Sequence, residues 1–412
     1  NGANGMHLAF RIADQMGWHR DLLSIMSPSK PVSPERLQNA QAALAVSVGL
    51  DIASLEAQIP KLIKKHRVAG VGVGVLQEGR LVWTGYYGEQ GPDIAVSYRT
   101  LFNTASVAKT ITAETIIAMA AAGQIDLDAS IATHVQHPDL SKDARYASLT
   151  PRLLMSHQAG LLNWAYNYDD NRLAFVHAPG SRFSYSGAGV ELAALYAQAR
   201  MGEDFEALAR KHVWQPAKIK NMSLGRLHPW VSERLAQPMD ADGHFQPIDA
   251  FSRRLSSRSD GRWSAADDLL TSVNDYGRLL ERLLQEHRTG PKTKDAEARR
   301  VQLRSTILTS LADDEVWRCQ ATPKVRCAQL FGHSIGWMVY EYGDHTVIKH
   351  GGNDRGENAL VYFSPQTQRG AVILVNGGNG IFVSTQILRL IGDEPELAAY
   401  YEQLIERFYG SD

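Results

Sequence analysis

Strand-forming segments lie near both ends of this chain, and their distribution constrains the fold more than any other feature of the sequence. Residues 71–76 and 80–85 are two β-rich runs joined by a short glycine-containing turn, which predicts a hairpin. Strand signals return late in the chain, at residues 336–342, 345–349, 358–363 and 370–375. Between them strand signals are sparse. We therefore predict an α+β fold in which one antiparallel sheet is built from both ends of the chain, rather than a βαβ series.

Helical periodicity fills most of the remaining sequence. Apolar residues at helical spacing predict helices at residues 53–66, 107–122, 188–200, 273–286, 381–390 and 397–408. The charged stretch Glu286–Arg300, which contains Gly290 and Pro291, predicts a solvated loop. These patterns divide the chain into an N-terminal extension of unknown role (1–50), a sheet region (51–105 with 330–412) and a mainly helical region (106–329). We expect a catalytic cleft between the last two.

Charge and hydropathy argue against two classes of partner. The chain has 43 basic and 44 acidic residues, a net charge of -1, and no basic stripe, so nucleic acid is not expected to bind. No apolar run approaches the roughly 20 residues of a membrane-spanning helix. Residues 1–30 lack the pattern of an export signal, although a removed leader is left open. Cys319 and Cys327 could close a small loop by a disulfide, and bridged and free thiols are both left open.

The segment Ser106-Val-Ala-Lys109 combines a hydroxyl and an amine where a helix is predicted to begin. Side chains three residues apart share a helix face, so Lys109 should reach the Ser106 hydroxyl. A helix N-terminus also offers backbone N–H groups to a developing oxyanion. Partial burial would disfavour the ammonium form and leave Lys109 able to accept a proton. A second S-x-x-K pattern, Ser27–Lys30, precedes Pro31 and has no helix signal after it, which argues against a second site.

Two further motifs follow in order, Tyr185-Ser-Gly187 before a predicted helix and Lys349-His-Gly-Gly352 after a β-like run. With Ser106-Val-Ala-Lys109 they resemble the three motifs of the serine β-lactamase, DD-peptidase and esterase superfamily, specifically its class C-like branch. Supporting likeness is found at residues 153–161, 260–267 and 336–337, and the resemblance spans about residues 52–390.

The resemblance implies a role for each motif residue. Tyr185 would act with Lys109 as the base that activates Ser106, and a phenol beside an ammonium is suited to shuttling a proton. His350 would orient Tyr185 or bind a substrate carboxylate or carbonyl. The backbone N–H groups of Ser106 and Asn353 would form the oxyanion hole. Neither a metal nor an organic cofactor is implied.

Departures from the family pattern bear on the substrate. Gly187 stands where β-lactamases and peptidases carry an asparagine that binds the substrate amide, and His350 and Gly351 replace their lysine and threonine. We therefore predict poor turnover of penicillins and a small-molecule ester or an amide or peptide as substrate. Gly351 and Gly352 leave room for a substrate against the strand. Trp164, Tyr166 and Tyr168 either wall the acyl pocket or serve packing.

Three other interpretations compete with this one. Gly332-His-Ser-Ile-Gly336 fits the nucleophile elbow of α/β-hydrolases, with Ser334 as nucleophile, but a strand rather than a helix is predicted after it. His134 and His137 lack the glutamate of a zinc motif, and His157 is interpreted as a hydrogen-bonded structural residue. A binding protein of the same fold without turnover is the remaining alternative. The resemblance slightly favours a periplasmic or secreted location over a cytoplasmic one, and the oligomeric state is not fixed by sequence.

Overall fold

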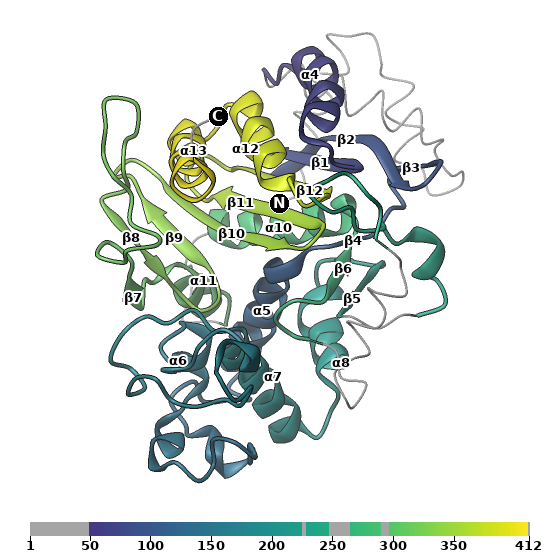
Figure 1. Cartoon of the computed structure of the whole chain (residues 1–412). Helices are drawn as coiled ribbons and strands as arrows, with labels where there is room; N and C mark the ends of the chain where they lie inside the picture. The colour runs from purple at the N-terminus through teal and green to yellow at the C-terminus, as the bar shows by residue number, and fades with distance from the viewer. Residues whose placement is uncertain (1–48, 225–227, 247–263, 290–295, 411–412) are drawn as a thin grey trace.

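The computed structural model describes residues 49–224, 228–246, 264–289 and 296–410 (Figure 1). Most of the predicted N-terminal extension, including the second S-x-x-K pattern at Ser27–Lys30, lies outside the described residues. So do residues 260–263 of the segment that supports the family resemblance.

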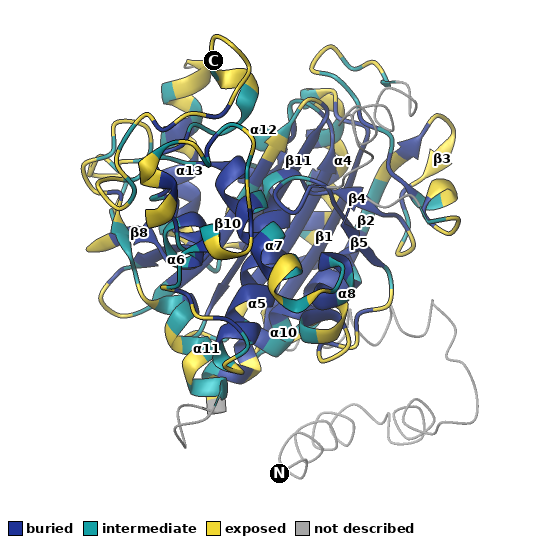
Figure 2. Cartoon of the chain, turned by 90° about the horizontal axis from the view of Figure 1, so that it is seen from below, coloured by how far each residue is buried: buried dark blue, intermediate teal, exposed yellow. Residues whose placement is uncertain are grey.

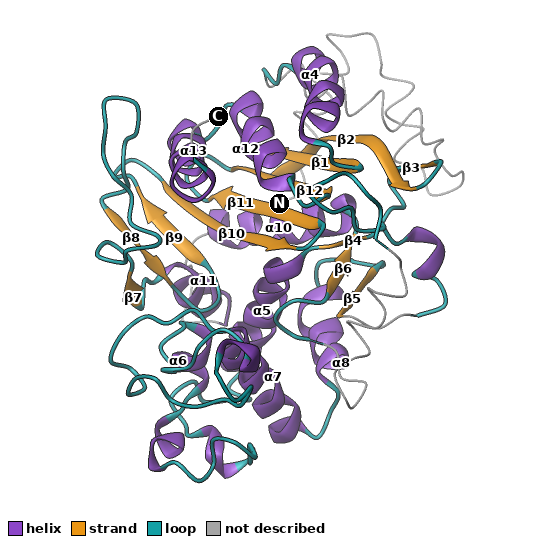
Figure 3. Ribbon diagram, viewed as in Figure 1, coloured by secondary structure: helices purple, strands orange, loops and turns teal. Residues whose placement is uncertain are grey.

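A nine-stranded antiparallel sheet forms the centre of the molecule, in the order β3-β2-β1-β12-β11-β10-β9-β8-β7 (Figure 3). Early strand β1 pairs with late strand β12 from Gly70↔Asn376 to Leu76↔Gly370, so the two ends of the chain meet in mid-sheet. The predicted α+β fold is confirmed. The strands are β1 Gly70–Gln77, β2 Arg80–Gly91, β3 Ile94–Ala95, β7 Thr309–Ser310, β8 Leu330–His333, β9 Met338–Glu341, β10 Thr346–Asp354, β11 Glu357–Ser364 and β12 Arg369–Asn376.

Helices cover both faces of this sheet. Three of them, α4 Ile52–His66, α12 Gly380–Ile391 and α13 Pro395–Tyr409, lie together on one face (Figure 1). On the other face α10 Val273–Thr289 packs against strands β1, β2 and β12. Beyond it lies the helical region, with α5 Ala108–Ala121, α6 Pro151–Met155, α7 Gly187–Met201, α8 Phe205–Ala209, α11 Ala296–Ser305 and the short turns η1 Ala105–Val107, η2 Ile131–Thr133, η3 Ala144–Ser148, η4 Ala165–Asn167, η5 Arg210–Trp214 and η6 Ser232–Arg234.

The alternation of side chains along β1 explains how helix α10 can lie so close to the sheet. Val71, Val73 and Val75 point to the face covered by α4 and α12, whereas the glycines between them point to α10. A Cβ atom on Gly72 would lie 2.6 Å from Val273, the first residue of α10. Because strand residues alternate between faces, this Val-Gly pattern gives one face an apolar core and lets a helix backbone approach the other.

Helix α5 runs through the middle of the helical region and is buried on almost every side (Figure 2). It is not amphipathic, as expected for a helix surrounded by other elements. A three-stranded sheet that the sequence did not predict, ordered β4-β6-β5, lies beside it. Its strands are β4 Phe102–Asn103, β5 Met222–Leu224 and β6 Leu269–Thr271. Strands of two or three residues are too short to show a period in the sequence.

The loop before β8 is closed by a disulfide between Cys319 and Cys327, whose Cα atoms are 5.7 Å apart. The Gln403 side chain of α13 accepts from the Gln320 backbone N–H and donates to its carbonyl, which fixes this loop against the helix. Of the helices in the described ranges, none is both long enough and apolar enough to cross a bilayer.

Candidate active site

Ser106 is presented by a sharp turn between β4 and α5. The Thr104 N–H donates to the Leu269 carbonyl (3.0 Å), which ties the approach to the small sheet. Ala105 then adopts φ 45°, in the left-handed region that costs a non-glycine residue about 1–2 kcal/mol. Ser106 follows in the 3₁₀ turn η1, half-buried, and α5 begins at Ala108. The predicted position of the serine at a helix start is confirmed, with the first turn in 3₁₀ form.

Lys109 is fully buried and directed at Ser106. Its Nζ lies 2.8 Å from Ser106 Oγ and 2.9 Å from the Ala266 carbonyl oxygen. The same nitrogen lies 5.0 Å from the centroid of the Tyr185 ring. The second acceptor belongs to a turn in which the Ser264 hydroxyl donates to Glu191 Oε1 (2.6 Å), so this carbonyl is held in place from α7. Lys109 therefore joins two of the predicted site residues.

Tyr185 stands immediately before α7. Ser186 caps this helix, since its Oγ accepts from the Gly189 N–H (3.0 Å). The Ser186 N–H donates to His157 Nδ1 (3.1 Å), and the His157 ring lies 4.3 Å from the Tyr185 ring, centroid to centroid. This bond agrees with the interpretation of His157 as a hydrogen-bonded structural residue. Sequence reasoning nevertheless missed its contact with Tyr185, because the two residues are distant in sequence and no local pattern links them.

The third motif lies on β10, at the point where this strand loses one neighbour. Its register with β9 runs from Thr346↔Glu341 to Lys349↔Met338, so the edge beyond Lys349 is not paired with β9. There β10 packs on η1 instead. A Cβ atom on Gly352 would lie 2.1 Å from the Thr104 carbonyl oxygen and 3.1 Å from the Ser106 backbone nitrogen. Only glycine permits this approach, and it brings the exposed Asn353 to the strand edge beside the serine.

His350 belongs to a group of three buried rings, His157, His333 and His350, which we call the imidazole cluster. His333 lies 4.6 Å from His157 and 6.2 Å from His350, centroid to centroid. Burial, with the nearby Lys109 charge, holds the pKa of His350 well below its usual value, and burial lowers the pKa of His333 to about 3. These rings are therefore neutral near pH 7. Sequence reasoning missed His333, because this residue lies within the 332–336 segment that was considered only as a possible Ser334 nucleophile motif.

Hydrogen bonds assign the tautomers of two rings. His350 Nδ1 lies 2.7 Å from the Gly351 carbonyl oxygen and must donate, which leaves Nε2 as an acceptor. His157 Nδ1 accepts from a backbone N–H, which leaves its Nε2 as the donor. Over the described ranges no protein group lies within hydrogen-bond distance of either Nε2. Both ring nitrogens of His333 also lack a hydrogen-bond partner among the described residues, so the cluster holds free donors and acceptors beside Lys109.

Trp164 packs directly on Gly187. A Cβ atom at Gly187 would lie 2.4 Å from Trp164 Cζ2, and the indole centroid is 5.8 Å from Lys109 Nζ. Tyr166, in the next turn η4, is 69% exposed, and the Tyr168 hydroxyl bridges the Leu162 N–H and the Ala174 carbonyl. Of the three aromatic residues considered as a pocket wall, Trp164 is the one that reaches Lys109. Gly351 faces away, since its Cβ would meet the Tyr401 hydroxyl behind the sheet.

A second buried polar group, which we call the ionic cluster, lies further along α5. Arg304 is fully buried and donates to both carboxylate oxygens of Glu114 (2.6 and 2.5 Å) and to Glu286 (3.0 Å). Glu114 also accepts from Trp337 Nε1 (2.9 Å). Burial alone would lower the pKa of Arg304, but the two carboxylates outweigh burial and raise it.

The prediction of a solvated loop at Glu286–Arg300 is therefore wrong at both ends. Residues up to Thr289 belong to α10, residues from Ala296 belong to α11, and the intervening 290–295 lie outside the described residues. Glu286 is buried in ion pairs with Arg282, Arg300 and Arg304, which sequence periodicity cannot show.

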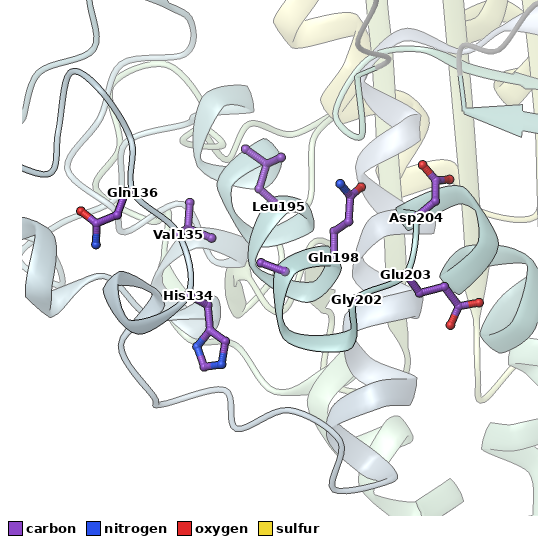
Figure 4. A pocket seen from close by; sticks show the side chains of 9 residues that line it. His134, Val135, Gln136, Leu195, Gln198, Gly202, Glu203 and Asp204 are labelled. Atoms are coloured by element: carbon purple, nitrogen blue, oxygen red, sulfur yellow. The ribbon is translucent and has the colours of Figure 1, made fainter.

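The structure does not support the two competing catalytic sites, the Ser334 motif and a metal site. Ser334 lies in the tight turn between antiparallel β8 and β9, with no helix after it, so the nucleophile elbow is wrong. No three His, Cys, Asp or Glu side chains converge as metal ligands in the part of the chain that the structure describes. His134 instead borders a surface hollow of about 550 Å³ at the far end of α7, together with Gln198 and Glu203 (Figure 4). That hollow contains none of the residues predicted for the site.

The structure thus combines an antiparallel sheet flanked by helices with a serine and a buried lysine at the start of a central helix. The chain belongs to the beta-lactamase family, whose model, described as Beta-lactamase, matches residues 52–393. The resemblance inferred from the three motifs is confirmed.

Individual relatives are distant. Penicillin-binding protein 4 of Amycolatopsis lactamdurans is 23% identical over 363 residues, which cover 83% of this chain and 90% of that protein. Protein flp of Staphylococcus aureus strain MW2 is 23% identical over 176 residues, 39% of this chain, and the match spans about a third (35%) of that protein.

Solved structures show the same fold at low identity. The octameric penicillin-binding protein homologue from Pyrococcus abyssi superposes with a TM-score of 0.65 at 17% identity, covering 87% of this chain and 82% of its own. D-alanine carboxypeptidase AmpC from Burkholderia cenocepacia gives a TM-score of 0.62 at 18% identity, covering 81% of this chain and 96% of its own.

Proposed function

We propose that this protein is a serine hydrolase that transfers an acyl group from an ester or an amide to water through an acyl-Ser106 intermediate. The observation that carries the proposal is the contact of Lys109 Nζ with Ser106 Oγ at 2.8 Å, under the ring of Tyr185. A partly buried serine held by a fully buried amine is the arrangement of an activated nucleophile.

The reaction proceeds in two acyl transfers. Lys109 and Tyr185 together accept the Ser106 proton as Oγ attacks the substrate carbonyl carbon. The oxyanion receives hydrogen bonds from the backbone N–H groups of Ser106 and Asn353, and collapse of the intermediate expels the alcohol or amine, which takes the proton. A water molecule then repeats the attack on the acyl-serine and releases the acid.

The third motif favours a substrate without a carboxylate beside the scissile bond. His350 is neutral and buried, so it offers no full positive charge to an anion. Lys349, its neighbour on β10, points to the opposite face and donates to the Tyr401 hydroxyl (2.9 Å). We therefore place esters and amides with an uncharged leaving group ahead of penicillins, whose carboxylate would lack a cationic partner at this strand.

The central test is substitution of the nucleophile. Ser106→Ala should lower hydrolysis of p-nitrophenyl acetate by at least about a thousandfold, as loss of a nucleophilic serine does in other enzymes. A fluorophosphonate probe should label the wild-type protein on the peptide that contains Ser106. Ser334→Ala, which alters the serine of the rejected motif, is the matched control and should retain both activities. Unchanged turnover in Ser106→Ala, or folded protein that no probe labels, would favour a binding protein without turnover.

A substrate panel tests the specificity. Short acyl p-nitrophenyl esters or C-terminally amidated D-amino-acid peptides should be processed at a higher kcat/KM than nitrocefin, because this chain has neither the lysine nor the asparagine of the family at the two motif positions where it departs from the pattern. Rapid nitrocefin hydrolysis would contradict this preference while leaving the role of Ser106 intact.

A further inference from the structure

The position of the Trp164 ring requires a glycine at position 187. An ideal Cβ on Gly187 would lie 2.4 Å from Trp164 Cζ2 and 2.5 Å from Cη2, well inside the limit of real carbon contacts. Any side chain at position 187 would therefore have to displace the indole. The tryptophan ring occupies the space that a side chain at position 187 would need.

Hydrogen bonds fix the backbone that leads into Trp164. The segment Leu161–Asn163 runs beside the start of α7 and is bonded to it step by step. The bonds are Ser184 Oγ to the Leu161 carbonyl (2.7 Å), Ser186 Oγ to the Leu162 carbonyl (2.9 Å), the Gly187 N–H to Asn163 Oδ1 (2.8 Å) and the Ala188 N–H to the Asn163 carbonyl (2.9 Å). Trp164 is the next residue, so its position opposite Gly187 is set by the backbone on both sides.

The indole also lies beside the reacting groups. Its centroid is 5.8 Å from Lys109 Nζ, which itself contacts Ser106 Oγ, and the ring is only partly buried. An indole face carries no hydrogen-bond acceptor, and its single donor is the N–H at the ring edge. An acyl group that enters beside Ser106 on this side meets a flat apolar surface.

We propose that Trp164 selects the acyl group, and that the selected class is an aryl or other flat apolar acyl chain without an amide near the scissile carbonyl. The inference rests on the proposed function, because it names the substrate class of the same site. A ring stacks favourably on the indole, whereas an amide pressed against it loses water without gaining a partner. Trp164 is thus a specificity-determining residue rather than a catalytic one.

A matched pair of substrates isolates this preference. p-Nitrophenyl 4-phenylbutanoate and p-nitrophenyl hippurate share a leaving group, a phenyl ring and a chain length, and differ by one amide. Each kcat/KM is divided by the hydroxide-catalysed rate of the same ester, which removes intrinsic reactivity. The wild-type protein should favour the phenylbutanoate by about tenfold or more.

Substitution then assigns the preference to the indole. Trp164→Ala should bring the normalised ratio to about one, and Trp164→Phe, which keeps a flat ring, should retain part of it. Gly187→Ala should lower kcat/KM for both esters by about tenfold in the wild-type background and much less in Trp164→Ala, because the clash needs both residues. Trp230→Ala, which alters an exposed ring stacked on His228, should leave the ratio unchanged.

Two failures can be told apart. Ser106-dependent turnover whose ratio is the same in wild type and Trp164→Ala would overturn this inference alone. Absence of Ser106-dependent turnover of both esters would overturn the proposed function together with the inference.

Discussion

Two buried polar clusters lie along helix α5, and they differ in how many of their polar groups have hydrogen-bond or ion-pair partners. At its start Lys109 lies beside Ser106 and the imidazole cluster, whose rings are neutral and leave both assigned Nε2 atoms without a protein partner among the described residues. Further along, Glu114 belongs to the ionic cluster, in which Arg304 is opposed by two carboxylates at hydrogen-bond distance.

The comparison separates buried groups that hold the fold from buried groups poised for chemistry. In the ionic cluster every charge is paired, so no group is left to take up or release a proton. Because the paired residues belong to α5, α10 and α11, the cluster fixes these helices relative to one another. The imidazole cluster keeps unused donor and acceptor positions near Lys109, the residue that contacts Ser106, and buried polar groups without partners cost stability. Burial is common to both, and partnering is what distinguishes them.

The largest expected effect is on stability. Arg304→Met should lower the free energy of unfolding by about 3–5 kcal/mol, because Glu114 would be left buried without a cation and Glu286 would keep only Arg282 and Arg300. Urea unfolding followed by circular dichroism measures this loss. The kcat/KM of the remaining folded protein should stay near wild type.

The exposed pair Arg389–Glu402 provides the matched control. Both of its side chains are about half exposed, so Arg389→Met should cost no more than about 1 kcal/mol. Equal losses in the two variants, or a loss of activity without a loss of stability in Arg304→Met, would erase the distinction between the clusters.

The next effect is on catalysis. Lys109→Ala and Tyr185→Phe should each lower kcat/KM for p-nitrophenyl acetate by at least about a hundredfold, the scale of a lost proton-transfer partner. Lys349→Met is the matched control, since Lys349 is also a buried lysine but contacts Tyr401 on the other face of the sheet. If Lys349→Met lost as much activity per folded molecule as Lys109→Ala, burial rather than contact with Ser106 would explain both.

The smallest effect is the pH dependence of stability. Burial lowers the pKa of His333 to about 3, below the ordinary value near 6.5. The unfolded chain therefore binds a proton below about pH 6.5 that the folded protein does not, and His333 makes stability fall with decreasing pH by up to about 1.4 kcal/mol per unit. His333→Gln should be less sensitive than wild type between pH 6.5 and 5.

Urea titrations of both proteins at pH 7.5, 6.5 and 5.5 measure this difference, in which the other titrating groups cancel. His244→Gln, at a side chain that is 78% exposed, should keep the wild-type slope. Identical slopes for wild type and His333→Gln would show that His333 titrates like an exposed histidine.

Local patterns predicted much of this architecture. Predicted helices at 107–122 and 188–200 correspond to α5 and α7, and the hairpin at 71–85 to β1 and β2, because each element carries its own period and its own turn residues. The relation of Ser106 to Lys109 was predictable for the same reason, since residues three apart on a helix are neighbours in any fold.

Contacts between distant residues were not predictable in this way. Nothing local places His333 beside His157, sets Trp164 over Gly187, or marks Glu286 as buried by Arg304. The strands of the small sheet were missed because two or three residues are too few to show a repeating pattern.

The sequence by itself determined the order of the long helices and of the strands of the large sheet's hairpin and C-terminal part, the hydroxyl–amine pair and the family, since all of these depend on residues close together in the chain or on motifs in series. The tertiary structure decided which buried polar groups are satisfied and which are free, and which ring packs on Gly187 near Lys109. The physical reason is that burial, charge pairing and side-chain packing are properties of surfaces brought together from distant parts of the chain, and only folding brings those surfaces into contact.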